Sequence, residues 1–470
     1  MTVLKLVTPD HPAPQPKPAT FTGLRPAAPV PPLRRLGFFA AIRALQANPI
    51  TAFAEQAYEA DMLPVRRFTG IVLVNQPQAI LRIFVGNADN YAKSRQQQRR
   101  LQPGLGEGLL TAEGETWRAA RRLTAPLFTP KAVTQLFEDM QAEASAMRER
   151  WLTRPEPSAP LDLAAEFQRL TYEIVSRTVF SGDLDDDRLQ IQANMAVYFD
   201  SVGRINISNL FNLPPWLPTP TALRARPALK FFRSVVERAV TARDKAGRRE
   251  AGDLLDRLLQ AADPQTGKGM SAPQVSDNVL TFLAAGHETT ANALAWILYL
   301  LALYPQAEER VVAEIEANAG KTLDTLVFTR AVINETLRLY PPAPFIGRQA
   351  LGDDELAGWP IKAGTQLLIA PWMLHRHRRL WSEPDAFRPE RFLPPQAEAI
   401  ERGTYLPFGL GPRICIGQGF AIQEILIVLT TILPAFRFRL VDPERVFPKA
   451  HLTLSPLNGL PMIVSARRPG

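Results

Sequence analysis

Hydrophobic positions recur at helical spacing up to about residue 340 of the chain. Apolar residues three and four apart in AVTQLFEDMQAEASAMRERWL (132–152) and FFRSVVERAVTARDKAGRRE (231–250) predict amphipathic helices. Short apolar runs predict strands at GIVLVN (70–75), TQLLIAP (365–371) and HLTLSP (451–456). The segment 341–414 is rich in Pro, Gly and Arg, which predicts a long irregular connection. The pattern therefore indicates a mainly α-helical protein with small β-sheets.

Two longer apolar stretches predict buried helices. TFLAAGHETTANALAWILYLLALYP (281–305) is long enough to cross a membrane, but it contains the polar string at 287–290, and charge is costly in hydrocarbon. We therefore expect a buried central helix there. FAIQEILIVLTTILPAF (420–436) is interrupted by the polar pair 423–424 and predicts a second core helix.

Composition fits a large globular protein of 470 residues, of which 46% are hydrophobic and 21% charged. Residues 1–35 are dense in proline, which predicts an extended N-terminal segment, and 36–470 is expected to form a single domain, fewer than length alone would suggest. The net charge of +8 is spread along the chain, so no nucleic-acid partner is expected, although a basic face could dock an acidic protein. The N-terminus lacks the order of a secretory signal, which predicts a cytoplasmic protein without a membrane anchor.

Cys415 is the only cysteine, so it cannot form an intrachain disulfide. It is either a small buried hydrophobe or a thiolate with a chemical task. Its neighbours favour the thiolate, because the glycines of FGLGPRICIG let backbone N–H groups approach the sulfur; these are Gly409, Gly411 and Gly417. A helix predicted to begin at 418 adds the positive end of its dipole.

Two further side chains of this loop fit a metal-binding thiolate. Phe408 can exclude water, and Arg413 places a cation two residues from the sulfur, where it can pair with an anion. A second glycine-rich string, PGLGEGLL (103–110), departs from the G-x-G-x-x-G pattern because Leu109 stands at its last glycine. We interpret that string as a mobile loop rather than a phosphate cradle.

The spacing Phe408-x-x-Gly411-x-Arg413-x-Cys415-x-Gly417 resembles the haem-binding loop of the cytochrome P-450 superfamily. Three more motifs follow the order of that family, so the resemblance extends over nearly the whole chain. It implies the cytochrome P-450 fold, a triangular prism in which haem lies between a central I-type helix and an L-type helix. The cofactor would be haem b, held non-covalently, with the Cys415 thiolate as the axial ligand of iron.

The first of these motifs is Glu335-Thr336-Leu337-Arg338. A Glu and an Arg three residues apart share a helix face, and such a pair is more often an exposed one of little consequence. Here the pair precedes PERF (389–392), which resembles the second arginine-bearing element of the family. The resemblance implies a buried network of Glu335, Arg338 and Arg391 that supports the irregular segment.

The second motif is Trp117-Arg118-Ala119-Ala120-Arg121. Trp117 and Arg121 lie one helical turn apart, so an indole N–H and a guanidinium can reach one anion; an ordinary amphipathic helix with solvated arginines is the alternative. By resemblance these two residues bind a haem propionate. Arg348 matches another propionate-binding position, and Arg413 supplies a third cation.

The third motif, AGHETT, lies in the predicted central helix. Gly286 costs about 1 kcal/mol there relative to Ala, and the Thr289 hydroxyl can bond back to the carbonyl of Ala285. The resemblance implies a notch over the iron, in which Ala285 and Gly286 give room to dioxygen. Thr289 would hydrogen-bond the bound oxygen, and Glu288 would deliver protons.

Neighbouring residues are expected to take other parts. Thr290 should face away from the notch, and His287, His375 and His377 are not expected to bind metal. The substrate pocket would be lined from 98–114, from 195–225, from Phe282, Ala284 and Ala285, and from 343–346.

The resemblance implies a monooxygenase that inserts one oxygen atom from O2 into a hydrophobic small molecule. AGHETT resembles the fatty-acid hydroxylase branch, with terpenoid, steroid and aromatic compounds as the next classes. Electrons would come from a separate ferredoxin and an NAD(P)H-dependent reductase, and Arg118 and Arg122 would help to dock the ferredoxin on what is expected to be a monomer. Alternatives are a peroxygenase or isomerase that needs no external electrons, and a haem gas sensor or carrier.

Overall fold

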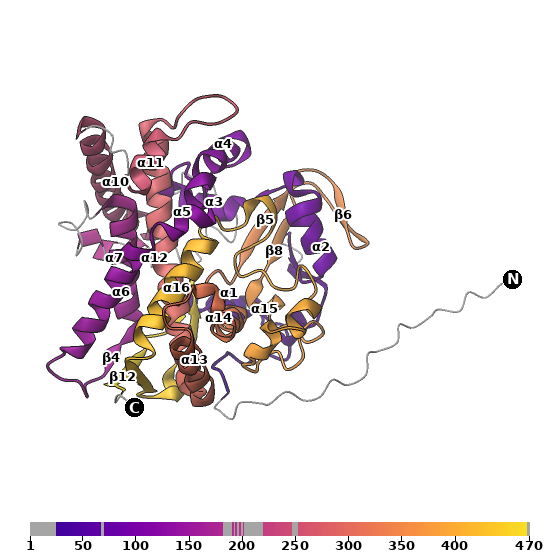
Figure 1. Ribbon diagram of the computed structural model, residues 1–470. Coiled ribbons are helices and arrows are strands. Elements are labelled where there is room, and N and C mark those ends of the chain that lie inside the picture. The colour runs from indigo at the N-terminus through magenta and orange to yellow at the C-terminus, as the bar shows by residue number, and fades with distance from the viewer. Residues whose placement is uncertain are drawn as a thin grey trace.

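The computed structural model describes residues 25–66, 70–181, 190–191, 193–194, 197–198, 201, 220–246 and 252–467. The predicted extended segment 1–35 falls partly outside these ranges. From residue 25 to the start of the first helix the described chain has no regular element. Most of the long helices lie on one side of the molecule, and the strands β5, β6 and β8 lie on the other side beside α2 and α15 (Figure 1). Element labels follow that figure.

The helices confirm the expectation of a mainly α-helical protein. They are α1 (Phe38–Ala47), α2 (Pro77–Leu81), α3 (Arg95–Leu105), α4 (Gly114–Thr124), α5 (Pro130–Thr134), α6 (Phe137–Leu152), α7 (Leu163–Phe180), α10 (Pro220–Ala246), α11 (Leu254–Gln260), α12 (Ala272–Leu303), α13 (Pro305–Ala317), α14 (Val327–Leu339), α15 (Pro371–Leu374) and α16 (Gln418–Ile432).

The strands are short. They are β1 (Met62–Arg66), β2 (Ile71–Val74), β3 (Tyr91–Lys93), β4 (Leu161–Asp162), β5 (Ile346–Ala350), β6 (Asp354–Leu356), β7 (Trp359–Ile361), β8 (Gln366–Ile369), β9 (Phe436–Leu440), β10 (Pro448–Ala450), β11 (Leu454–Pro456) and β12 (Pro461–Ala466). The largest sheet has the order β1-β2-β8-β5-β3, with β2 and β8 parallel and the other pairs antiparallel. The other sheets have two or three strands.

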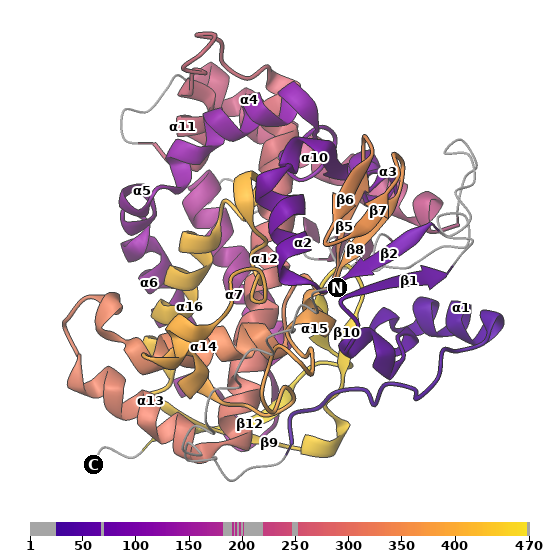
Figure 2. The same ribbon diagram turned by 90° about the vertical axis from the view of Figure 1, so that its right-hand side faces the viewer.

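The central helix α12 organises the core. Its start is fixed by a capping box between Ser271 and Gln274, and most of its length is buried on all sides, as expected of a helix that is apolar all round. It packs against α7, α10, α14 and α16. In Figures 1 and 2, α16 lies beside α12 in both views. The Trp296 ring of α12 stacks on Tyr340 with centroids 4.0 Å apart.

The two buried apolar helices were predicted correctly. Three details differ from the sequence-based expectation. The pattern at 132–152 is divided between α5 and α6, because the chain turns at residues 135–136. The segment 341–414 holds the four strands β5 to β8, where only one strand was predicted. The run 451–456 forms a strand only over β11.

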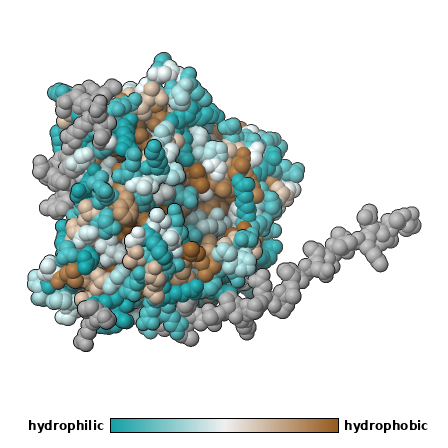
Figure 3. Space-filling model, viewed as in Figure 1, coloured by the Kyte–Doolittle hydropathy of each residue, from teal (hydrophilic) through white to brown (hydrophobic). Residues whose placement is uncertain are grey.

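Apolar residues on the face shown in Figure 3 occur as small groups among hydrophilic ones. None of the helices within the described ranges combines the length and the apolar character that a bilayer crossing requires.

Candidate functional site

The Cys415 loop is held in a tight turn between residue 408 and the start of α16. The Cys415 N–H donates a 2.8 Å hydrogen bond to the Phe408 carbonyl. Gly411 has φ +71°, and a Cβ there would lie 1.9 Å from the carbonyl oxygen of Phe84, so no other residue fits without displacing backbone. The glycine therefore allows the loop to pack directly on the segment after α2.

The Cys415 side chain is exposed, but many protein atoms lie close to its sulfur. Burial raises the pKa of the thiol, while the Gly417 backbone N–H and the Arg121 guanidinium act in the opposite direction. The Gly417 N–H is one of the donors expected from the glycines of the loop, whereas the cation that acts on the thiol is Arg121 and not the expected Arg413. A thiol whose ionisation is opposed by burial becomes a stable thiolate when a metal cation binds it.

A second accessible spot interrupts the buried helix α12. Ala285 is exposed and Gly286 and Thr289 are partly exposed, although Leu283, His287 and Thr290 nearby are buried. The Thr289 hydroxyl donates a 2.7 Å hydrogen bond to the Ala285 carbonyl, as predicted. Accessible residues in the middle of a core helix indicate an internal space at this point.

The Glu288 carboxyl is directed to the C-terminal hairpin. Its Oε1 accepts a 2.7 Å hydrogen bond from the Thr453 hydroxyl, in the loop between β10 and β11. Burial raises the pKa of Glu288 to about 7, and the Thr453 hydrogen bond opposes this increase. A group with this pKa can both hold and release a proton near neutral pH.

A cluster of cations gathers around the start of α4. The Arg413 guanidinium donates to both carboxylate oxygens of Glu113 and lies 4.5 Å from the centre of the Trp117 ring. Arg348 is buried, donates to its neighbour's carbonyl and lies 4.8 Å from the ring centre of Phe84.

Sequence reasoning missed two members of this cluster. The Lys93 ammonium donates to the carbonyls of Leu109 and Ala112, and burial, with Arg413 and Arg348 nearby, lowers its pKa to about 7. Glu113 accepts from Arg413 and from the Lys93 backbone N–H. Only the position of Lys93 at the end of β3, the strand that pairs with β5, links it to Arg348, and no local pattern marks it.

The Glu335 network is present and buried as predicted. Arg338 and Glu335 form two hydrogen bonds of 2.7 and 2.8 Å, and Arg391 donates to Glu335 over 3.3 Å. Arg338 also donates to three backbone carbonyls between residues 375 and 386. The network therefore ties α14 to the segment that leads to the Cys415 loop.

The other polar residues singled out in the sequence are buried in the protein core. His375 accepts from the Leu406 N–H at Nε2, and its Nδ1 lies 3.3 Å from the Arg338 carbonyl. Burial lowers the pKa of His287 to about 4. Thr290 is buried next to Glu424 of α16. Burial raises the pKa of Glu424 to about 8, and the Thr290 hydrogen bond opposes this increase. No group of three or more His, Cys, Asp or Glu side chains in the described ranges could hold a metal ion.

The string 103–110, interpreted as a mobile loop, is partly helical, because α3 extends to Leu105. The turn that follows is bonded to α12: the Glu107 N–H donates to Asp277 over 2.8 Å and the Leu109 N–H to Asn278 over 3.0 Å. A Cβ at Gly106 would lie 2.1 Å from the Asp277 carboxylate. Tertiary contacts with α12 hold this turn.

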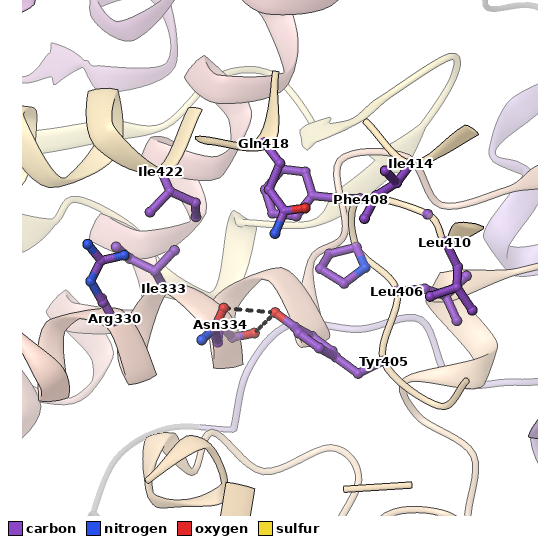
Figure 4. Close-up of a pocket in the computed structure, with 12 residues that line it drawn as sticks. Arg330, Ile333, Asn334, Tyr405, Leu406, Phe408, Leu410, Ile414, Gln418 and Ile422 are labelled. Atoms are coloured by element: carbon purple, nitrogen blue, oxygen red, sulfur yellow. Dashed lines mark hydrogen bonds between the residues drawn. The ribbon is translucent and has the colours of Figure 1, made fainter. Parts of the chain in front are cut away.

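Of the expected pocket lining, Ala343 is exposed, Ala284 is partly exposed and Phe282 is buried. Residues 202–219 lie outside the described ranges. A separate pocket of about 370 Å³ lies beside the Cys415 loop, lined by α14, residues 405–410 and the start of α16. Figure 4 shows the Tyr405 hydroxyl bonded to Asn334 at its floor, with Phe408 and Gln418 alongside.

Comparison with known proteins is consistent with this arrangement. The cytochrome P450 family model matches residues 54–461. Cyclooctatin synthase of Streptomyces melanosporofaciens is 32% identical over 83% of this chain and 86% of its own length. Cyclooctat-9-en-7-ol 5-monooxygenase of the same organism is 34% identical over 77% and 79%, and pentalenene oxygenase of Streptomyces avermitilis 32% identical over 78% and 81%.

The chain therefore belongs to the cytochrome P450 family and is a haem monooxygenase whose iron ligand is a cysteine thiolate. The described residues fit such a cofactor. An accessible thiol and an accessible notch on α12 leave space. The guanidinium groups of Arg348 and Arg413, with the partly protonated Lys93 beside them, lie near the carboxylate of Glu113, so propionates would add negative charge to a site that carries a net positive charge.

Proposed function

We propose that this member of the cytochrome P450 family inserts one atom of O2 into an apolar, hydrocarbon-rich small molecule of the terpenoid class. The observation that carries the proposal is the notch on α12, where Ala285 and Thr289 are accessible within an otherwise buried helix. Accessible alanine and glycine residues next to a hydroxyl suit a non-polar substrate and dioxygen.

The cofactor in this proposal is haem b, held without a covalent bond, with Cys415 as the iron ligand. Phe408 and Gly417 shape the loop around the thiolate, and Trp117, Arg121, Arg348 and Arg413 bind the propionates. A haem iron with a thiolate ligand supplies O2 activation, because the thiolate donates electron density that favours O–O cleavage.

Two residues of α12 handle protons in the proposed reaction. The Thr289 hydroxyl lies at the accessible notch and can reorient from the Ala285 carbonyl toward a new acceptor. Glu288, with its pKa of about 7, is protonated in a large fraction of molecules at neutral pH and can resupply a proton. Ala285 and Gly286 provide the space.

The proposed substrate class rests on the relatives. Two of them are named for the oxidation of cyclooctat-9-en-7-ol and of pentalenene, which are an unsaturated alcohol and an unsaturated hydrocarbon by name. The expected lining at Phe282, Ala284 and Ala343 is apolar, which fits such compounds. The AGHETT string keeps long-chain fatty acids as the second class to test.

An optical titration of the purified ferric haem protein tests the substrate proposal. Cyclic hydrocarbons and terpenoid alcohols form one arm, and fatty acids of matched carbon number form the other. We expect the Soret band to shift from low to high spin with the first arm at lower concentrations. A shift with fatty acids alone would reverse the order of the two classes, and a protein that takes up no haem would overturn the whole function.

The alternative without external electrons predicts a different phenotype for Thr289→Ala. In a monooxygenase that variant should divert reducing equivalents to hydrogen peroxide, so that product per NAD(P)H falls severalfold. Thr290→Ala is the matched control, because the Thr290 side chain is buried against Glu424. The peroxygenase would be favoured if wild type and Thr289→Ala gave equal product yields with peroxide as the sole oxidant and no product with NAD(P)H.

We also propose that the electrons come from a separate ferredoxin and its NAD(P)H-dependent reductase. Of the two arginines predicted to dock it, Arg122 is bound to the buried Asp263 over 2.8 Å. The Arg118 side chain is 45% exposed, and among the residues that the structure describes it pairs with the exposed acids Asp89 and Glu115. The docking proposal therefore rests on Arg118. A monomeric, cytoplasmic protein stays a prediction.

Charge reversal tests this docking surface. Arg118→Glu should lower the ferredoxin-dependent rate severalfold at low salt and reduce its salt dependence, since exposed charges steer association. Arg148→Glu, at a comparably exposed position on α6, is the control. If both variants keep the wild-type rate and salt dependence, the ferredoxin docks elsewhere.

A further inference from the structure

We propose that Thr453, held by Asn292, is a positioning residue that fixes the Glu288 carboxyl and leaves Oε2 as its proton-bearing oxygen. The proposal rests on the proposed role of Glu288 as a proton donor and adds two residues to it. Thr453 lies in the C-terminal hairpin loop, 165 residues from Glu288 in sequence.

The direction of the hydrogen bonds follows from the chemistry of the three groups. The Asn292 amide nitrogen lies 3.2 Å from the Thr453 hydroxyl oxygen and can only donate to it. The Thr453 hydroxyl then has its single hydrogen free for Glu288 Oε1, 2.7 Å away. The chain of donors therefore runs from Asn292 through Thr453 to Glu288.

This arrangement distinguishes the two oxygens of the carboxyl group. Oε1 already receives a hydrogen, so a proton added to it would face the Thr453 hydrogen. Oε2 is buried and has no hydrogen-bond partner within the described ranges. Protonated Glu288 therefore carries its proton on Oε2, where it is free to be transferred.

The position of Thr453 is set by the tertiary structure. Asn292 and Thr453 are both buried, at 1% and 7% exposure. The Leu454 N–H donates to the Pro342 carbonyl, and the Trp296 indole N–H donates to the Leu454 carbonyl, both over 3.0 Å. The hairpin loop is thus anchored to α12 and to the segment that follows α14.

Two other titratable side chains lie near Glu288, and burial keeps both of them uncharged near pH 7. His287 packs edge-on against Tyr172 of α7, with centroids 6.1 Å apart, and burial keeps it neutral at physiological pH. Glu424 of α16 lies beside Thr290, and burial keeps it largely protonated at pH 7. His451 lies two residues from Thr453, and its backbone N–H donates to the Thr453 carbonyl.

Infrared difference spectroscopy of the haem-loaded protein tests the proposal directly. The carboxyl stretch of protonated Glu288 is assigned by its absence in Glu288→Gln and followed against pH. Thr453→Val keeps the shape but loses the hydrogen bond to the ionised form, so we expect the titration midpoint to rise by about half to one pH unit. Thr453→Ser should restore it, and Ser455→Ala in the same hairpin should leave it unchanged.

The pH profile of coupling gives a second readout. Protonated Glu288 should persist to higher pH in Thr453→Val. The pH at which product per NAD(P)H falls on the basic side of the profile should therefore increase together with the infrared midpoint. Thr453→Ala serves the same purpose if the valine variant does not fold. An unchanged midpoint in these variants would overturn the proposal.

The outcome separates this inference from the proposed function. If the wild-type protein oxidises no substrate but its Glu288 midpoint responds to Thr453→Val, the positioning role stands and the proposed function fails. If oxidation occurs and the midpoint does not respond, only the positioning role fails.

Discussion

The guanidinium of Arg338 forms two hydrogen bonds with the carboxylate of Glu335, and neither side chain is exposed to solvent. Arg338→Ala should therefore destabilise the protein by about 3–5 kcal/mol, because it leaves Glu335 charged and buried without its main partner. Urea unfolding of the purified proteins measures this change.

Arg330→Ala on the same helix α14 is the matched control. Arg330 pairs with Asp324, which is 89% exposed, so the free energy of unfolding should fall by less than about 1 kcal/mol. Similar losses in the two variants would show that the buried pair has no special weight.

Glu424→Gln should change how stability depends on pH. Burial raises the pKa of Glu424 from 4.5 to about 8, so between these values the folded protein keeps a proton that the unfolded chain releases. The wild-type free energy of unfolding should therefore fall as pH rises through this window, by up to about 1.4 kcal/mol per pH unit from this group.

The Gln variant cannot ionise and should lack this contribution, so its advantage over wild type should grow from pH 5 to pH 8. Urea unfolding at four pH values measures the difference. Glu316→Gln, at an exposed position on α13, should follow the wild-type curve. Parallel curves for wild type and Glu424→Gln would contradict the prediction.

Arg348→Met should weaken haem retention. Arg348 is buried near Lys93 and Arg413, and within the described ranges its guanidinium donates to the Gly347 carbonyl and to no carboxylate, so a propionate would supply the missing anion. Loss of a charge-assisted hydrogen bond should speed haem transfer to an acceptor globin roughly 10- to 100-fold. Arg95→Met, at an exposed site on α3, should transfer haem at the wild-type rate.

Asp277→Ala should loosen the turn after α3. The Glu107 amide donates to Asp277, so its hydrogen exchange should accelerate by roughly tenfold or more when that acceptor is removed. Asn278→Ala provides the reciprocal control, because it should accelerate exchange at Leu109 and not at Glu107. Exchange rates that rise equally at both amides in both variants would indicate general loosening of α12.

The short-range features of this protein could be predicted from the sequence. The buried helices α12 and α16 follow from apolar composition, and the back-bond from Thr289 to Ala285 follows from helical spacing of four residues. The Cys415 loop was recognisable because glycine positions, a cation and a thiol occur within ten residues. The chain's membership of the cytochrome P450 family confirms the family resemblance that was drawn from this loop.

Long-range partners could not be predicted in the same way. Lys93 and Glu113 join Arg413 only because β3 pairs with β5 and α4 begins beside the Cys415 loop. The turn at 106–109 looked mobile because its acceptors lie about 170 residues away, on α12. Such contacts depend on how distant segments pack, and no periodic pattern encodes them.

The sequence by itself determined the helices, the thiolate loop and the order of the motifs, because each depends on residues close together in the chain. Only the tertiary structure decided which polar groups meet. Glu288 is bonded to Thr453 because the C-terminal hairpin packs on α12. Burial at that contact raises the pKa of Glu288 to about 7, since desolvation opposes the charged form.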